Sequence, residues 1–392
     1  MASFQKYETK KGFKWLLIVE VGVDPVTGKR KQKKIRGFKT KKAAQLAAAR
    51  LEQEVTNGTY INEPDILFKD FVQEWLNIYS KATKISSLRV RQKQSDKLVD
   101  YFANIKMKDI TKKIYQAALN NLHDKGYAFN TLDGIHTAGR MIFKKAIELQ
   151  IIKSNPTDNV KIPRKVETVE DIENSKKVIK YMEKEELAYF LQVAKEKGLD
   201  NDYVFFSVLA YSGLRAGELL ALKWTDVNFE NNTIKITKTL YNPNNNGQHY
   251  HLLTPKTKGS IRTIKMDDGI IKLLKSHKAK QNELKLYTRT KYVDKGFVIT
   301  KSSGYPEVIK MIQNRLKRLL KLSNIIKNIT PHSFRHTHTS LLIEAGVGIK
   351  EIQQRLGHTD IETTMNIYAH MTKNMEEKAS QKFSELMKGF VI

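Results

Sequence analysis

The sequence predicts a multidomain protein with a small α+β domain at the N-terminus, then an all-α domain, then a mainly α domain with a small antiparallel sheet. Strand-like alternation of apolar and polar residues occurs near the N-terminus and again around residues 233–266. Apolar residues at helical spacing dominate the remainder. Breaks near residues 58–64 and 156–177 interrupt these patterns. We therefore expect domains at residues 1–60, 65–163 and 175–392.

The chain is strongly basic. Its 392 residues include 69 Lys and Arg against 41 Asp and Glu, which leaves a formal net charge of +28. Such an excess favours nucleic acid as the partner, because binding releases condensed counterions. An RNA- or ribosome-associated protein, or simply a charged soluble surface, would share this composition. A disordered basic tail is excluded, because 40% of the residues are hydrophobic and can form cores of ordinary domain size.

Cysteine is absent, which removes disulfides, thiolate nucleophiles and cysteine-type zinc sites and fits a reducing cytoplasm. The first twenty residues interleave lysine with glutamate and contain no signal-peptide apolar run. The longest apolar stretches, such as residues 15–19, are far shorter than a bilayer demands. We therefore expect a cytoplasmic protein with no membrane partner.

The first domain is predicted to contain two strands and a helix. Residues 13–23 are rich in β-branched and aromatic side chains, residues 24–28 form a turn, and a second strand follows over residues 33–38. Residues 41–55 then change to an alanine-rich helical pattern.

The second of these strands is unusually basic. No acidic residue interrupts residues 29–42. A strand with this composition could lie against phosphates while the helix supports the sheet from behind. The alternative is a solvated edge strand that its charge protects from aggregation. The candidate DNA contacts are Lys31, Lys33, Lys34 and Arg36.

The middle domain shows only helical patterns. These cover residues 67–80, 87–102, 111–125 and 130–149. Basic side chains lie together on the second of these helices, and Arg89 and Arg91 are candidate DNA contacts. A helix with many charges is, however, most often a solvated face.

The third domain begins after a linker of mixed charge at residues 165–177. A buried helix over residues 202–210 is broken by Gly213, which leads into a turn at Arg215. Residues 233–240 alternate like a strand and are predicted to pair with residues 262–266, which leaves a polar hairpin between them.

Short motifs in this domain carry the side chains of a phosphodiester-transfer site. They read Tyr-Ser-Gly-Leu-Arg-Ala-Gly-Glu-Leu at residues 211–219, Pro-His-Ser-Phe-Arg-His-Thr at 331–337 and Leu-Gly-His-Thr-Asp at 356–360. An isolated tyrosine follows. Together they supply a proton donor, a guanidinium clamp and a nucleophile. The residues are Arg215, His332, Arg335, His358 and Tyr368.

Cleavage of a phosphodiester requires cations, because its oxygens repel a nucleophile and its alkoxide leaving group needs a proton. Arg215 and Arg335 could hold the non-bridging oxygens through paired N–H donors. Arg335 follows His332 by three residues, so one short helix would present both to the same phosphate.

A phenol nucleophile would store the bond energy in a 3′-phosphotyrosyl ester, so the reaction needs no metal, ATP or other cofactor. His332 and His336 are four residues apart, a spacing that zinc sites also use. We reject zinc because the chain has neither cysteine nor an HExxH motif, and because Arg335 would repel a dication. His336 and His338 are expected to pack or to face DNA.

These ordered motifs resemble the tyrosine recombinase family, which includes the integrases of temperate phages and conjugative transposons. The resemblance implies an arm-type DNA-binding domain at residues 1–60, a core-binding domain at 65–163 and a catalytic domain at 175–392. It implies cleavage and rejoining of double-stranded DNA attachment sites by a homotetramer, which integrates or excises a mobile element. An excisionase and a host DNA-bending protein are the accessory partners it implies.

The resemblance also implies roles for single residues. Lys256, in a Thr-Pro-Lys-Thr-Lys-Gly loop, matches a mobile lysine that acts as general acid toward the 5′ oxygen, with Lys258 as the close alternative. His358 would brace the phosphate by a hydrogen bond, and Tyr368 would be the nucleophile. Glu218 matches an acidic position that orients Arg215 or the histidines. A first-turn carboxylate favoured by the helix dipole would explain Glu218 as well.

Two features point to other interpretations. One stretch mimics a helix-turn-helix, with helices at residues 339–345 and 349–356 and a turn at 346–348. This motif alone would suggest a repressor or architectural DNA-binding protein without cleavage activity. Binding alone would not require the ordered set of polar residues. After Tyr368, apolar residues recur at helical spacing from Met375 to Met387, and this stripe must be buried on its own domain or on a neighbouring protomer.

Overall fold

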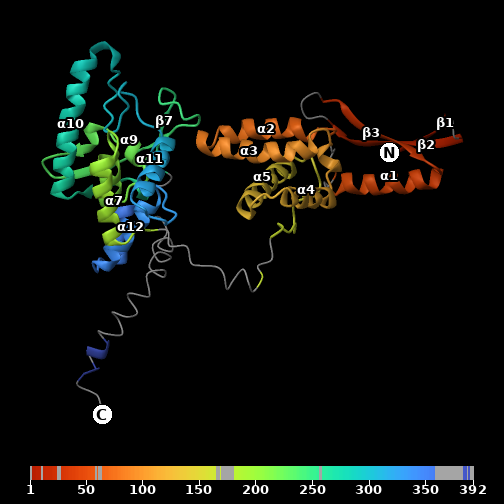
Figure 1. Ribbon diagram of the computed structural model, residues 1–392. Helices are drawn as coiled ribbons and strands as arrows, with labels where there is room; N and C mark the ends of the chain where they lie inside the picture. The colour runs from red at the N-terminus through yellow and green to blue at the C-terminus, as the bar shows by residue number, and fades with distance from the viewer. Residues whose placement is uncertain are drawn as a thin grey trace. The chain divides into compact units, whose positions relative to one another are not determined.

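The computed structural model describes residues 2–9, 12–23, 28–57, 60, 64–164, 168, 181–255, 258–357, 383–385 and 387–388. The chain divides into two compact units, Met1–Val166 and Glu167–Ile392 (Figure 1). The expected linker at residues 165–177 lies outside the described residues except for residue 168. None of the described helices is both long and apolar enough to cross a membrane.

The first unit begins with a three-stranded antiparallel sheet in the order β1-β2-β3, with helix α1 alongside it (Figure 1). Leu17 and Val19 are completely buried together with Ala48 of the helix, so apolar burial holds α1 on one face of the sheet. Strand β1 was not predicted, because it is a half-exposed edge strand with mostly polar residues. The elements are β1 Ser3–Thr9, β2 Gly12–Val23, β3 Arg30–Phe38 and α1 Lys41–Thr56.

The remainder of this unit is helical, as predicted. Phe68, Phe102 and Phe143 pack into one aromatic core with Tyr115, and the ring centroids of Phe68 and Phe102 lie 5.4 Å apart, edge to face. The four expected helices are confirmed, with ends that differ by one or two residues. They are α2 Phe68–Ser80, α3 Ile85–Phe102, α4 Lys112–Asp124 and α5 Phe129–Glu148.

The second unit is built mainly from helices. Phe334 packs against Phe190 and Phe206, at centroid distances of 5.5 and 5.4 Å, and so fixes α12 against α7 and α8. The helices are α7 Lys184–Lys197, α8 Asp202–Ser212, α9 Ala216–Ala221, α10 Asp268–Thr288, α11 Ile309–Leu322, α12 Ser333–Glu344 and α13 Ile349–Leu356. Short 3-10 turns occur across both units at Met107–Asp109, Trp224–Asp226, Lys258–Ser260 and Arg289–Lys291.

A small antiparallel sheet, β4-β5-β8, completes the second unit. The predicted pairing of residues 233–240 with 262–266 is confirmed for its first half, because Thr233 lies opposite Lys265 and Ile236 lies opposite Arg262. The predicted strand is wrong beyond Ile236, because residues 239–240 belong to a second hairpin, β6-β7, which was not predicted because each of its strands has three residues. The strands are β4 Val227–Asn228, β5 Thr233–Ile236, β6 Thr239–Tyr241, β7 His251–Leu253 and β8 Arg262–Lys265.

Candidate active site

Arg215 lies in the turn between α8 and α9, and Gly213 sets the direction of that turn. Gly213 ends α8 in the left-handed conformation, with φ of 64°. A Cβ at this position would lie 2.6 Å from Cδ2 of Leu356 and 2.8 Å from Cδ2 of His338. Glycine is therefore required both by the backbone conformation and by the close approach of α12 and α13. Arg215 follows as the N-cap of α9, with its side chain 40% exposed.

Glu218, in the first turn of α9, accepts two hydrogen bonds from Arg215. Its Oε1 accepts from Nη1 of Arg215 at 2.9 Å, and its Oε2 accepts from the backbone N–H of Arg215 at 3.1 Å. The carboxylate is 4% exposed. Burial alone would raise the pKa of Glu218, but the hydrogen bond and charge of Arg262 and the charge of Arg215 lower it overall. Glu218 is thus at once a first-turn carboxylate and a partner of Arg215.

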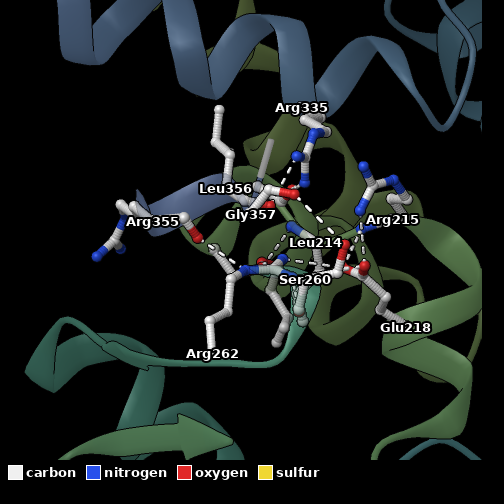
Figure 2. Close-up of polar contacts among 12 residues, drawn as sticks. Leu214, Arg215, Glu218, Ser260, Arg262, Arg335, Arg355, Leu356 and Gly357 are labelled. Atoms are coloured by element: carbon white, nitrogen blue, oxygen red, sulfur yellow. Dashed lines mark hydrogen bonds and ion pairs between the residues drawn. The ribbon is translucent and has the colours of Figure 1, made fainter. Parts of the chain in front are cut away.

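Arg262 of β8 is the third member of this group and was not identified from the sequence. Its Nη2 donates to Oε2 of Glu218 at 2.9 Å, and Nη1 lies 3.5 Å from Oε1 (Figure 2). The remaining donors bind main-chain carbonyls: Nη1 binds Ser260 at 3.1 Å, and Nε binds Arg355 at 2.8 Å. Alternation on β8 provides a signal that could have revealed it, because Arg262 shares the buried face with Ile264. A charged residue in that register needs a buried partner.

Arg335, in the first turn of α12, is 1% exposed. Its Nη1 donates to the carbonyl of Gly213 at 3.0 Å, and its Nη2 donates to the carbonyl of Leu356 at 2.7 Å. Burial lowers the pKa of the guanidinium, and the charge of Arg215 lowers it further. Arg335 therefore joins the end of α8 to the end of α13, close to the charge of Arg215.

His332 is the N-cap of α12 and is exposed. Its ring lies edge to face with that of His336, at a centroid distance of 4.8 Å. Partial desolvation by the surrounding protein lowers the pKa of His332 to about 4, and the charges of His336, Arg335 and Arg215 lower it in the same direction. The imidazole is therefore neutral at neutral pH, and an anion bound beside it would raise its pKa.

The C-terminal end of α13 faces the buried arginines. The carbonyl of Arg355 accepts from Arg262, and the carbonyl of Leu356 accepts from Arg335 (Figure 2). Gly357 then ends the helix with φ of 68°, and a Cβ there would lie 3.2 Å from Cδ of Arg262. Because a helix C-terminus carries partial negative charge, it offsets part of the repulsion among the guanidinium groups.

His338 and Arg355 connect α12 and α13 to α8 and β8 through hydrogen bonds. His338 is buried, with Nδ1 2.8 Å from the carbonyl of Ala210 and Nε2 3.1 Å from Nε of Arg355. Arg355 also donates to the carbonyls of Lys265 and Tyr211, each at 3.1 Å. Of the two roles expected for His338, packing or facing DNA, its surroundings favour packing.

Three of the expected residues lie outside the described part of the chain: Lys256, His358 and Tyr368. The backbone of Lys258 belongs to the 3-10 turn Lys258–Ser260, directly before β8. His358 follows Gly357 in the chain. Arg262 therefore binds two carbonyls that lie near the expected residues in the chain. One belongs to Ser260, four residues after Lys256, and the other to Arg355, three residues before His358.

The basic residues of β3 lie on two different faces of the N-terminal sheet. Lys34 lies opposite Ile18 and Arg36 lies opposite Leu16, on the face away from α1. Lys31 and Lys33 alternate with them and share the face of Ile35, which packs toward α1. Nζ of Lys33 lies 5.4 Å from the ring centroid of Tyr60. The expected set of four thus divides into an outward pair and an α1-facing pair.

The two arginines of α3 also differ. Nη1 of Arg91 donates to Oε1 of Gln94 at 2.7 Å, and both side chains are partly buried. Gln94 packs closely on α5, since a Cβ at Gly134 would lie 2.3 Å from its Nε2. Arg91 is therefore tied to the helix packing. Arg89 is half-buried two positions earlier.

Residues 180–375 match the Phage integrase family, and residues 3–55 match the Arm DNA-binding domain. Residues 67–123 match the N-terminal SAM-like domain of phage integrases. The chain belongs to the phage integrase family. Its predicted fold, with a small α+β domain, a helical domain and a mainly α domain that carries the small sheet, is confirmed.

Several relatives match this integrase over almost their whole length. The integrase of Staphylococcus phage L54a is 30% identical over 358 residues, which cover 86% of this chain and 98% of the relative. The prophage ps2 probable integrase of Lactococcus lactis is 31% identical over 368 residues, which cover 90% and 92%. The ICEBs1 integrase of Bacillus subtilis is 28% identical over 375 residues, which cover 94% and 96%.

Solved structures share the fold of this integrase. The Tn1549 transposon integrase in complex with a circular intermediate DNA has a TM-score of 0.62 at 21% identity, over 81% of this chain and 99% of that chain. A lambda integrase dimer bound to a core site has a TM-score of 0.57 at 16% identity, over 92% and 93%.

Family membership makes the chain a tyrosine site-specific recombinase. A repressor or architectural protein without cleavage activity is not favoured. The helix-turn-helix pattern corresponds to α12 and α13, and these helices form part of the candidate site: α12 carries Arg335, and the end of α13 accepts from Arg262 and Arg335.

Proposed function

We propose that this integrase cleaves and rejoins its DNA attachment sites at the centre formed by Arg215, Glu218, Arg262 and Arg335, with Tyr368 as the nucleophile. The observation that carries the proposal is the convergence of three guanidinium groups on one carboxylate and one helix end. The cluster keeps a positive excess, and Arg215 exposes 40% of its side chain. A phosphate diester is the anion that such an excess suits, through paired N–H donors.

In the proposed reaction, Arg215 and Arg335 stabilise the negative charge that accumulates on the non-bridging oxygens. The phenol oxygen of Tyr368 attacks phosphorus as the bond to the 5′ oxygen breaks. Lys256, or Lys258, supplies the proton to that oxygen, and His358 braces the phosphate. His332, neutral at neutral pH because its pKa is lowered to about 4, can accept the phenol proton. The products are a 3′-phosphotyrosyl ester and a 5′ hydroxyl.

Rejoining reverses these steps, with the 5′ hydroxyl of the partner strand as the attacking group, so the sequence balances without metal, ATP or another cofactor. We propose that four protomers hold two attachment sites and exchange one pair of strands at a time through a four-way junction. A lambda integrase tetramer bound to a Holliday junction, with a TM-score of 0.54 at 15% identity, has the same fold.

We assign residues 1–60 to arm-type DNA and residues 65–163 and 175–392 to the core site, a division that the separate family matches support. The accessory partners are an excisionase and a host DNA-bending protein. The proposed place of action is the cytoplasm, and the absence of cysteine from the chain suits its reducing conditions.

A suicide substrate with a nick near the cleavage point tests the proposal, because it traps the covalent adduct on a denaturing gel. Tyr368→Phe removes one oxygen, so the adduct should disappear while DNA binding in a gel shift stays close to wild type. Tyr211→Phe is the matched control, and its adduct should persist. An adduct in Tyr368→Phe would move the nucleophile elsewhere. Absence of an adduct in the wild type would favour a protein that only binds DNA.

A further inference from the structure

Arg262 is a buried cation in a place where the proposed reaction already has two. Its side chain is 5% exposed, against 40% for Arg215, so the protein and not the solvent surrounds it. Burying a third guanidinium next to Arg215 and Arg335 is unfavourable unless its partners compensate for the lost water and the repulsion. The structure supplies these partners from three separate parts of the chain.

Each contact of Arg262 is made with a segment that leads into the site. Glu218 belongs to α9 and also binds the backbone and the guanidinium of Arg215. The carbonyl of Ser260 ends the loop that contains the two candidate lysines. The carbonyl of Arg355 belongs to the last turn of α13, which precedes His358 in the chain (Figure 2).

We propose that Arg262 is a positioning residue for the strand-transfer reaction: it fixes Glu218, and through Glu218 the guanidinium of Arg215, against the end of α13 and the turn Lys258–Ser260. The inference rests on the proposed function. Arg262 does not touch the phosphate itself, because its donors are directed at Glu218, Ser260 and Arg355.

The geometry of the carboxylate explains why one arginine is not enough. Oε1 of Glu218 receives Nη1 of Arg215, and Oε2 receives Nη2 of Arg262 together with the N–H of Arg215. Without Arg262, the contacts described for the carboxylate are those with Arg215 itself, so no other described segment would fix Glu218 and Arg215 in place as a pair. Lysine cannot replace this function, because a single ammonium group cannot reproduce the planar fork that reaches all three partners.

Arg355 provides a matched control within the same structure. It too binds three segments, through His338 and the carbonyls of Lys265 and Tyr211. Its side chain donates to none of the oxygens of Glu218 in the described contacts. Arg355→Gln therefore loosens the same helix without acting on the carboxylate that holds Arg215.

A double-mutant cycle tests the proposal in the full-length chain. The first step of adduct formation on the suicide substrate is measured in single turnover at saturating protein, for Arg262→Gln and Arg355→Gln, each with Arg215 present and with Arg215→Ala. We expect Arg262→Gln to slow adduct formation about tenfold to a hundredfold, the range typical for outer partners that orient functional ligands. DNA binding by gel shift should change little.

The effect of each substitution in the protein that carries Arg215→Ala is the diagnostic result. With Arg215→Ala, Arg262→Gln should cost little more, because the group that it positions is absent, whereas Arg355→Gln should cost the same factor in both backgrounds. If Arg262→Gln slows the reaction by an equal factor in both backgrounds, or leaves the wild-type rate unchanged, Arg262 does not act through Arg215.

A loss of folding is separated from a loss of positioning by a second variant. If Arg262→Gln does not fold, Arg262→Lys, which keeps the buried charge, carries the same cycle, and thermal melting shows that the assayed protein is native. The same outcomes then support or overturn the inference. Failure of the proposed function looks different, because the wild type itself would form no adduct. If only this inference fails, the wild type still forms the adduct, and Arg262→Gln slows the reaction by the same factor with and without Arg215.

Discussion

Arg355 donates its Nε–H to Nε2 of His338 at 3.1 Å, and this bond determines the tautomer of a buried imidazole. Nδ1 of His338 lies 2.8 Å from the carbonyl of Ala210 and must therefore carry the proton. Protonation of Nε2 would replace an acceptor by a donor directly against a guanidinium. Burial first, and the charge of Arg355 second, accordingly lower the pKa of His338 to about 4.

The lowered pKa of His338 predicts that acid reduces the stability of the folded domain. As the pH falls below the ordinary value of 6.5, the unfolded chain takes up this proton before the folded chain does. The free energy of unfolding should therefore be insensitive to His338 above pH 7 and decrease as the pH falls from 6.5 to about 4, by about 3 kcal/mol in total. Denaturant unfolding at several pH values would measure it. His338→Gln should give a shallower pH dependence, and identical slopes would contradict the assignment.

The outward face of the N-terminal sheet should contact arm-type DNA. Replacement of Lys34 and Arg36 by alanine removes two charges from that face. The negative slope of the logarithm of the binding constant against the logarithm of the salt concentration should become shallower by about two. Replacement of Lys31 and Lys33 removes the same net charge from the α1-facing side and is the matched control. Gel shifts of the full-length protein on arm-site DNA at several salt concentrations give both slopes. Equal losses from the two pairs would show that total charge, and not the face of the sheet, determines binding.

Cleavage should continue in excess EDTA, because Arg215, Arg335 and Lys256 would provide the positive charge that many other nucleases obtain from a metal ion. The measurement is adduct formation on the suicide substrate with and without chelator. The control is a metal-dependent nuclease under the same conditions. Activity that disappears with EDTA and returns with Mg²⁺ would contradict the proposed mechanism.

The apolar stripe after Tyr368 should take part in assembly. Only residues 383–385 and 387–388 of this tail are described, so the prediction depends on the sequence pattern. Removal of residues 376–392 should leave binding to a single DNA site intact and weaken the joining of two sites in gel shifts. If thermal melting instead shows loss of the folded monomer, the stripe belongs to the core of its own domain.

Much of the fold follows from local sequence. Helical spacing predicted α2 to α5 within one or two residues of their ends, because a helix depends mainly on neighbours three and four residues away. The same local spacing brought Arg215 and Glu218 together on one turn, and His332 and Arg335 on another. Strand β1 and the hairpin β6-β7 escaped prediction, because short or exposed strands depend on partners elsewhere in the chain.

The ionic centre depends instead on which distant segments meet. Glu218, Arg262 and the carbonyl of Arg355 are far apart in the sequence, and no local pattern states that they bind one another. The faces of Lys33 and Lys34 likewise required the register of β2 with β3, since a shift of one residue would exchange them. The sequence alone specified the helices, the short motifs and the chemical types of the candidate residues, because these depend on near neighbours. Long-range packing selected the partners of each buried charge, because a buried charge is stable only where another part of the fold replaces its lost water.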